Sequence, residues 1–80
     1  MISFPTRVAK ELTRARTKHS NMHTLHEGYA VLLEEMDELW NGIKSKHPSL
    51  PDVLEELVQV AAMAQRFAED VLPGQLKGNR

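Results

Sequence analysis

Residues 33–40 read Leu33-Glu34-Glu35-Met36-Asp37-Glu38-Leu39-Trp40, and this stretch decides the fold. It places four acidic residues within five positions and has apolar residues at both ends. On a helix, residues three or four apart share a face, so Glu38 lies beside both Glu34 and Glu35. Apolar residues recur at similar spacing along a neighbouring stripe, which we expect to be buried: Leu32, Met36, Leu39 and Ile43.

Carboxylates crowded beside an apolar seam repel one another and are costly to remove from water. A positive group usually compensates for such a cluster, and a divalent cation bound through oxygen atoms is the simplest choice. A second acidic pair, Glu55 and Glu56, lies near the start of the next predicted helix. If the chain turns over about residues 45–52, an antiparallel hairpin brings Glu38 and Glu56 to similar depth.

Acids that face each other in this way would suit Mg²⁺ or Mn²⁺, which prefer oxygen ligands. A cation held there would bind phosphates and activate a water molecule. Glu-rich helices are common, so the pattern taken alone also allows a solvated acidic face.

The hydrophobic periodicity predicts three helices and no strand. The first runs from Thr6 to about His19, after a lead-in over residues 1–5. The second runs to about Lys44, with Asn21 or Thr24 as its cap, and Thr24 with Glu27 fits the reciprocal capping pattern. The third follows Ser49 and is expected to end at residues 73–74, Pro-Gly, which leaves a flexible tail over residues 75–80. We therefore expect an all-α antiparallel bundle that forms a single domain over residues 1–80.

The outer face of the first predicted helix is basic and carries Arg7, Lys10, Arg14, Arg16 and Lys18. Such a charged face is usually exposed to solvent. The alternative is a cationic wall that faces an anionic substrate.

Length and composition restrict the class of protein. Eighty residues bury only a modest core, so we expect the second and third helices to complete it in an oligomer. A net charge of −1 suggests neither a nucleic-acid nor a membrane partner. The sequence contains no cysteine, which excludes disulfides, thiolate zinc sites and a cysteine nucleophile. The expected location is the cytoplasm.

Residues 26–40 and 55–64, with the acids described above, resemble the MazG-like all-α nucleoside triphosphate pyrophosphohydrolases. That family carries a Glu-Glu-x-x-Glu motif on one helix and a Glu-x-x-Asp motif on the next. Here Glu34, Glu35 and Glu38 match the first motif, and Glu56 matches the first position of the second. The resemblance covers about residues 23–72 and implies release of pyrophosphate and a nucleoside monophosphate from a nucleoside triphosphate.

The resemblance also implies roles for individual residues. Glu35, Glu38 and Glu56 would bind Mg²⁺, with Mn²⁺ as a possible substitute. Glu34 would be a further ligand or would position the attacking water, so Glu34 and Glu35 are the expected catalytic pair. The expected substrate contacts are Lys44, His26 and Trp40, although Lys44 also suits a helix C-terminus and a lone Trp is often core. The expected assembly is a homodimer or a dimer of dimers.

One residue departs from the family pattern. Gln59 stands where the second motif has an aspartate, and its amide oxygen can ligate a hard cation but brings no charge. We therefore expect weaker metal binding or one fewer metal at this position. A relative that binds or sequesters nucleotides without hydrolysis is one alternative, and a plain helical interaction module is another. Because the sequence ends soon after the third helix, any substrate wall from a fourth helix is expected from another subunit.

Overall fold

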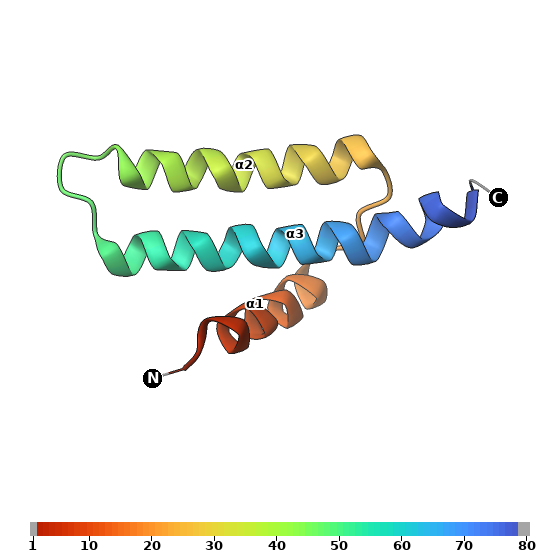
Figure 1. Ribbon diagram of the computed structural model, residues 1–80, viewed down its shortest axis with the longest axis horizontal. Coiled ribbons are helices and arrows are strands. Elements are labelled where there is room, and N and C mark those ends of the chain that lie inside the picture. Colours follow the sequence, from red (N-terminus) through yellow and green to blue (C-terminus); the bar gives the residue numbers. More distant parts are fainter. Residues whose placement is uncertain (1, 79–80) are drawn as a thin grey trace.

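The computed structural model describes residues 2–78, which form three helices and no strand. These are α1 (Phe4–Lys18), α2 (Leu25–Ile43) and α3 (Leu50–Gly78). Figure 1 shows α2 and α3 side by side in opposite directions, whereas α1 packs on another side of α3 at an angle. The backbones of α1 and α2 each approach α3 but not each other. The all-α class is confirmed, while the antiparallel three-helix bundle stays a prediction.

The helix starts follow from polar caps. The Thr24 side chain accepts a hydrogen bond from the Glu27 backbone N–H at 3.0 Å, so Thr24 is confirmed as the cap of α2. Glu27 also reaches back, and its Oε1 accepts from the backbone N–H of His23 at 2.6 Å, one residue before the cap. The Ser49 hydroxyl accepts from the Asp52 backbone N–H at 3.4 Å at the start of α3.

The prediction that the third helix ends at Pro73 was wrong, because α3 continues through it to Gly78. A proline lacks an N–H group and removes one hydrogen bond to the carbonyl four residues earlier, but a helix can continue around it. Pro73 is exposed, so the carbonyl that loses its partner lies near solvent. Residues 75–78 are therefore helical, and residues 79–80 of the predicted tail lie outside the described part of the chain. Figure 1 shows this last part of α3 extending beyond α2.

The core lies along α3, which is covered by α1 on one side and by α2 on another. Among the described residues, the buried apolar side chains come from α1, the α1–α2 connection and α3: Val8, Ala15, Met22, Val58, Ala62, Met63 and Val71. Gly28 is the one buried residue of α2.

The stripe of α2 that we expected to be buried is only half covered. Leu32 and Leu39 are partly buried, but Met36 and Ile43 are exposed. The difference arises because α2 has α3 as its single neighbour among the described helices, and one neighbour covers only a narrow stripe.

Gly28 permits close contact between α2 and α3. A Cβ atom placed on Gly28 would lie 2.6 Å from Cγ of the Phe67 ring, far inside van der Waals contact. The absence of a side chain at Gly28 is therefore what allows α3 to pack closely on this turn of α2.

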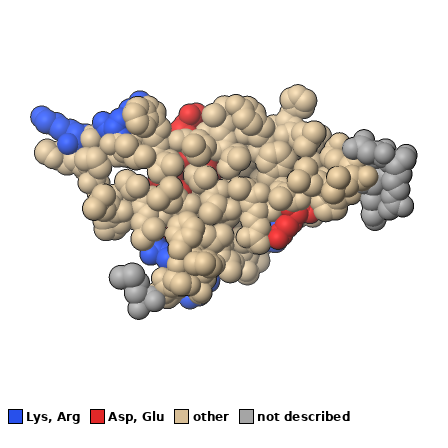
Figure 2. Space-filling model, in the orientation of Figure 1, with Lys and Arg blue, Asp and Glu red and all other residues tan. Residues whose placement is uncertain are grey.

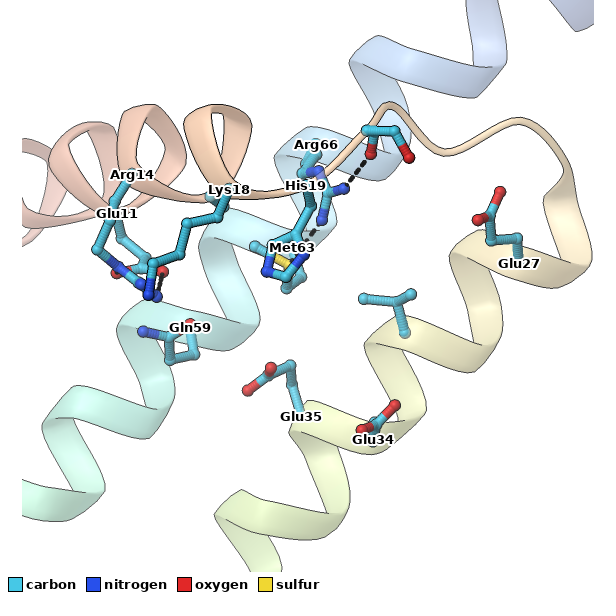
Figure 3. Close-up of a pocket in the computed structure, with 13 residues that line it drawn as sticks. Glu11, Arg14, Lys18, His19, Glu27, Glu34, Glu35, Gln59, Met63 and Arg66 are labelled. Carbon is cyan, nitrogen blue, oxygen red and sulfur yellow. Dashed lines mark hydrogen bonds and ion pairs between the residues drawn. The ribbon is translucent and has the colours of Figure 1, made fainter.

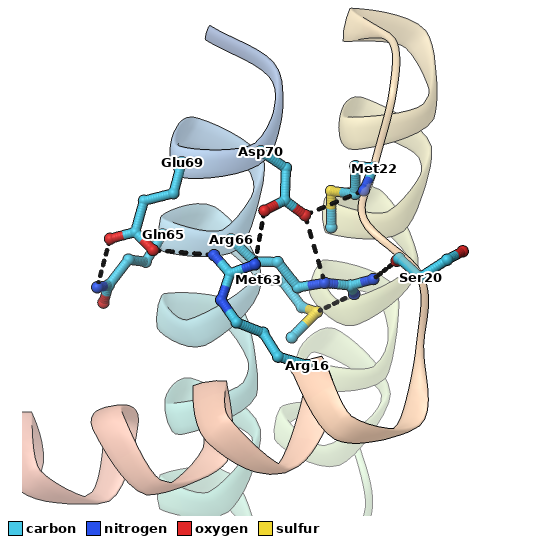
Figure 4. Close-up of polar contacts among 8 residues, drawn as sticks. All are labelled: Arg16, Ser20, Met22, Met63, Gln65, Arg66, Glu69 and Asp70. Carbon is cyan, nitrogen blue, oxygen red and sulfur yellow. Dashed lines mark hydrogen bonds and ion pairs between the residues drawn. The ribbon is translucent and has the colours of Figure 1, made fainter. Parts of the chain in front are cut away.

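Ion pairs hold α1 on α3. Arg16 donates to Asp70 at 2.6 Å and to Glu69 at 2.9 Å (Figure 4). At the other end of α1, Arg7 donates to Glu55 at 2.7 Å. Part of the basic face of α1 thus serves to dock the helix.

Within residues 2–78, none of the helices combines the length and the apolar character that crossing a membrane would require.

Candidate metal centre

Three carboxylates meet between the two helices of the hairpin. Glu35 and Glu38 lie one turn apart on α2, and Glu56 faces them from α3. One carboxylate oxygen from each lies within 4.8 Å of the other two, which is close enough for all three to reach one cation. The predicted apposition of Glu38 and Glu56 is confirmed. We refer to these residues, Glu35, Glu38 and Glu56, as the acid cluster.

Burial and neighbouring carboxylates disfavour the ionised forms of Glu35 and Glu56. Burial, followed by repulsion from Glu38, raises the pKa of Glu35 to about 7. Burial and the charge of Glu38 also raise the pKa of Glu56. Oε2 of Glu35 and Oε2 of Glu56 are both buried and accept no hydrogen bond from the described residues. Buried oxygens without donors are what a hard cation would ligate, so the residues present fit a divalent metal.

A cavity of about 580 Å³ opens beside the acid cluster, between all three helices (Figure 3). Its α2 wall includes Glu34 and Glu35, so Glu35 belongs to both the cavity and the acid cluster. Its α1 wall carries Arg14 and Lys18. The remaining residues that line it are Glu11, Ala15, His19, Ser20, Glu27, Val31, Gln59, Met63 and Arg66. The cavity therefore has acidic groups on its α2 wall, and on its α1 wall it has two basic groups beside one acid, Glu11.

Gln59 lines the cavity beside Glu11, a residue that sequence reasoning missed. Glu11 is only 9% exposed and forms a two-bond ion pair with Arg14, at 2.8 and 2.6 Å. The Arg14 hydrogen bonds, opposed by burial and helped by the Gln59 amide, hold the pKa of Glu11 below its usual value. The sequence does indicate that Glu11 is buried, because this residue falls between Val8 and Ala15 on the apolar stripe of α1.

Arg66 is a second cavity residue that sequence reasoning missed. It is nearly buried on α3, and its Nη2 donates to the Ser20 carbonyl oxygen at 2.6 Å. Its Nε lies 3.7 Å from Asp70 (Figure 4). Arg66 thus ties the end of α1 to the third helix at the rim of the cavity.

The three expected substrate contacts lie outside the cavity. His26 lines a separate shallow hollow with Leu25 and Tyr29. Lys44 is the C-cap of α2, and its backbone N–H donates to the Trp40 carbonyl oxygen at 2.9 Å. The Trp40 side chain is 57% exposed, so it is not part of the core of this chain. Their assignment to substrate stays a prediction.

Comparisons with models of protein families, with curated proteins and with solved structures found no match to this chain. The resemblance in the sequence therefore stays a prediction as well.

Proposed function

We propose that this protein is a cytoplasmic, Mg²⁺-dependent nucleoside or deoxynucleoside triphosphate pyrophosphohydrolase. The observation that carries the proposal is the acid cluster, with two buried oxygens that lack donors, at the edge of a cavity whose α1 wall carries two basic groups. A site for a cation next to a site for an anion suits a substrate that is itself a metal–phosphate complex. The sequence motifs at Glu34, Glu35, Glu38 and Glu56 support the same conclusion.

Each residue has a role in this proposal. Glu35, Glu38 and Glu56 would hold the cation, and the Gln59 amide oxygen is available as a neutral ligand. The bound cation would supply charge neutralisation to the phosphates and a more acidic water. Glu34, which is exposed at the cavity wall, would orient the water that attacks the α-phosphorus, and pyrophosphate would leave as the α–β bond breaks.

The test is pyrophosphate release from a panel of nucleoside and deoxynucleoside triphosphates with Mg²⁺ or Mn²⁺. We expect turnover that is lost in the Glu35→Ala/Glu38→Ala double variant and kept in Asp37→Asn. Asp37 is the matched control, because it is an exposed acid on the same helix outside the acid cluster. Turnover that survives in the double variant, or turnover by no triphosphate at all, would refute the proposal.

A second candidate function is nucleotide binding without hydrolysis. Gln59 is the observation that favours it, because this neutral residue stands where the family pattern has an aspartate, and one fewer carboxylate ligand would weaken metal binding. Binding of a triphosphate in calorimetry, with no pyrophosphate released, would select this function over the first.

We also propose that the chain forms a homodimer, or a dimer of dimers, through α2. An apolar stripe on α2 is at least 43% exposed at every position: Leu25, Tyr29, Leu33, Met36, Trp40 and Ile43. The face in Figure 2 carries few charged side chains over the hairpin, and its Lys and Arg side chains gather near the α2–α3 turn and on α1. Two such hairpins would bury both stripes as a four-helix bundle.

Light scattering after size exclusion tests the assembly. We expect Met36→Glu/Trp40→Glu to yield monomers, and Leu76→Glu, an exposed leucine outside the stripe, to leave the dimer intact. A monomeric wild-type protein would instead favour a helical interaction module that presents this stripe to another protein.

A further inference from the structure

We propose that α1 supplies a phosphate-binding wall within the same chain, in which Arg14 and Lys18 hold the oligophosphate of the substrate across the cavity from the acid cluster. The identity of the substrate rests on the proposed function, but binding of an oligophosphate anion does not require catalysis. The sequence left two alternatives for the basic face of the first helix, a solvent-exposed face and a cationic wall, and two of its basic residues, Arg14 and Lys18, line the cavity.

The geometry places both basic side chains on one side of the cavity. Arg14 and Lys18 are four residues apart on α1 and therefore share a face. Figure 3 shows both side chains extending from α1 toward Gln59, while Glu34 and Glu35 lie on the α2 side. The volume of about 580 Å³ falls within the range of roughly 300–1,000 Å³ that is usual for small-molecule pockets.

Arg14 and Lys18, the two residues of the wall, form no ion pair with α3, unlike Arg7 and Arg16. Arg7 and Arg16 are ion-paired with acids of α3 and dock the helix. Lys18 forms no ion pair within residues 2–78. Arg14 is paired only with Glu11 of its own helix, and its side chain stays 50% exposed. Of the three basic residues of α1 that have no ion pair to α3 among the described residues, Arg14 and Lys18 line this cavity, whereas Lys10 lines a different hollow.

The end of α1 that carries Lys18 is held in place. Arg16, two residues earlier, donates to Asp70, and the Ser20 carbonyl oxygen, two residues later, accepts from Arg66. Figure 4 shows these contacts converging on one turn of α3. A wall that is already positioned loses little conformational entropy when an anion binds, which favours affinity.

Isothermal calorimetry with inorganic tripolyphosphate and Mg²⁺ tests the wall without a nucleoside or a reaction. We expect Lys18→Gln to weaken binding by about tenfold, the effect of losing one charge-assisted contact. Lys10→Gln is the matched control, because Lys10 is an exposed lysine of α1 that lines a different hollow. We expect it to bind as the wild type does. Thermal unfolding of both variants checks that the fold is kept.

Arg14→Lys provides a second variant. It keeps a positive charge beside Glu11 but removes the planar guanidinium group, which can donate two parallel hydrogen bonds to one anion. We expect it to weaken tripolyphosphate binding by severalfold. No measurable binding to the wild type, equal binding by Lys18→Gln, or equal losses in Lys18→Gln and Lys10→Gln would each overturn the inference.

The two proposals fail in different ways. Tripolyphosphate binding that depends on Lys18, with no hydrolysis of any triphosphate, would keep the wall and refute the enzyme. Hydrolysis with an unchanged KM in Lys18→Gln, together with unchanged tripolyphosphate binding, would keep the enzyme and refute the wall.

Discussion

Glu35 on α2 and Glu56 on α3 bring carboxylate oxygens to within 4.8 Å of each other, and both carboxyls have raised pKa values in the folded chain. A raised pKa means that the folded state binds more protons than the unfolded state between the unfolded pKa of 4.5 and the folded pKa of about 7. Stability must therefore fall as the pH rises through this window. Without metal, we expect the Tm to drop by roughly 5 °C between pH 5 and pH 8, measured by circular dichroism in chelator. We expect Glu35→Gln to remove most of this drop in Tm. A wild-type Tm that does not fall over this pH range would contradict the raised pKa of Glu35.

Added Mg²⁺ should reverse the same effect. At pH 8 the Glu35 carboxyl is above its pKa of about 7 and is free to bind a cation, so millimolar Mg²⁺ should raise the Tm. At pH 5 protons compete with the metal for Glu35, and the shift should be much smaller. Glu38→Gln should abolish the shift at pH 8, whereas Asp37→Asn should keep it. A shift of equal size in both variants would mean that the metal binds elsewhere.

The apposition of the acids could be predicted because it depends on local signals. Residues 33–40 have a clear helical period, Ser49 and Thr24 mark helix starts, and a short connection between two helices leaves an antiparallel hairpin as the simple solution. Counting from the turn was then enough to place Glu38 opposite Glu56.

Other features depend on contacts that no local pattern encodes. The period of α2 shows that it has an apolar side, but it does not say whether α3 or a second chain covers Met36 and Ile43. The Pro73-Gly74 pair is a strong stop signal, yet an exposed position lets the helix continue. Glu11 and Arg66 were missed because charged side chains are buried only where tertiary partners exist.

Replacing Gln59 by aspartate tests how close position 59 is to the metal. The new carboxylate would add a charged ligand beside Glu35, so we expect Mg²⁺ binding to tighten by about tenfold or turnover to rise. The same carboxylate would also lie next to Glu11, so the two negative charges would repel each other. The apo variant should therefore be less stable than the wild type.

The double variant Glu11→Gln/Gln59→Asp should recover that stability and keep the gain in affinity, as measured by metal titration and thermal unfolding. No gain in either variant would show that position 59 does not reach the metal.

Gly28→Ala tests the contact between α2 and the Phe67 ring. Alanine favours a helix by about 1 kcal/mol over glycine, but the methyl group would have to displace an aromatic ring. We expect a net loss of about 1–2 kcal/mol in the free energy of unfolding, measured with urea at fixed protein concentration. Gly42→Ala is the matched control, because nothing lies within 4 Å of its Cβ position, and it should be neutral or stabilising. In a Phe67→Leu background the cost of Gly28→Ala should shrink, and an equal effect of both glycine replacements would refute the contact.

Asp70→Asn tests the anchor that positions α1. The Asp70 side chain is 3% exposed, and its two oxygens accept from Arg16 at 2.6 Å and from the Met22 backbone N–H at 3.0 Å. Burial acts to raise its pKa, but these hydrogen bonds and the charge of Arg66 hold the pKa below its usual value. A lowered pKa contributes stability that is present above the unfolded pKa and is lost as the pH falls through the folded one.

At pH 7 we expect Asp70→Asn to lower the free energy of unfolding by about 2–4 kcal/mol, because it leaves the buried Arg66 without a charged partner and leaves Arg16 with only the half-exposed Glu69. Glu69→Gln removes the other partner of Arg16, but solvent screens that half-exposed pair, so it should cost far less than Asp70→Asn. If α1 is placed by this anchor, Asp70→Asn should also weaken tripolyphosphate binding while Glu69→Gln should not. Equal effects of the two variants on unfolding would show that the buried carboxylate is not what holds α1 against α3.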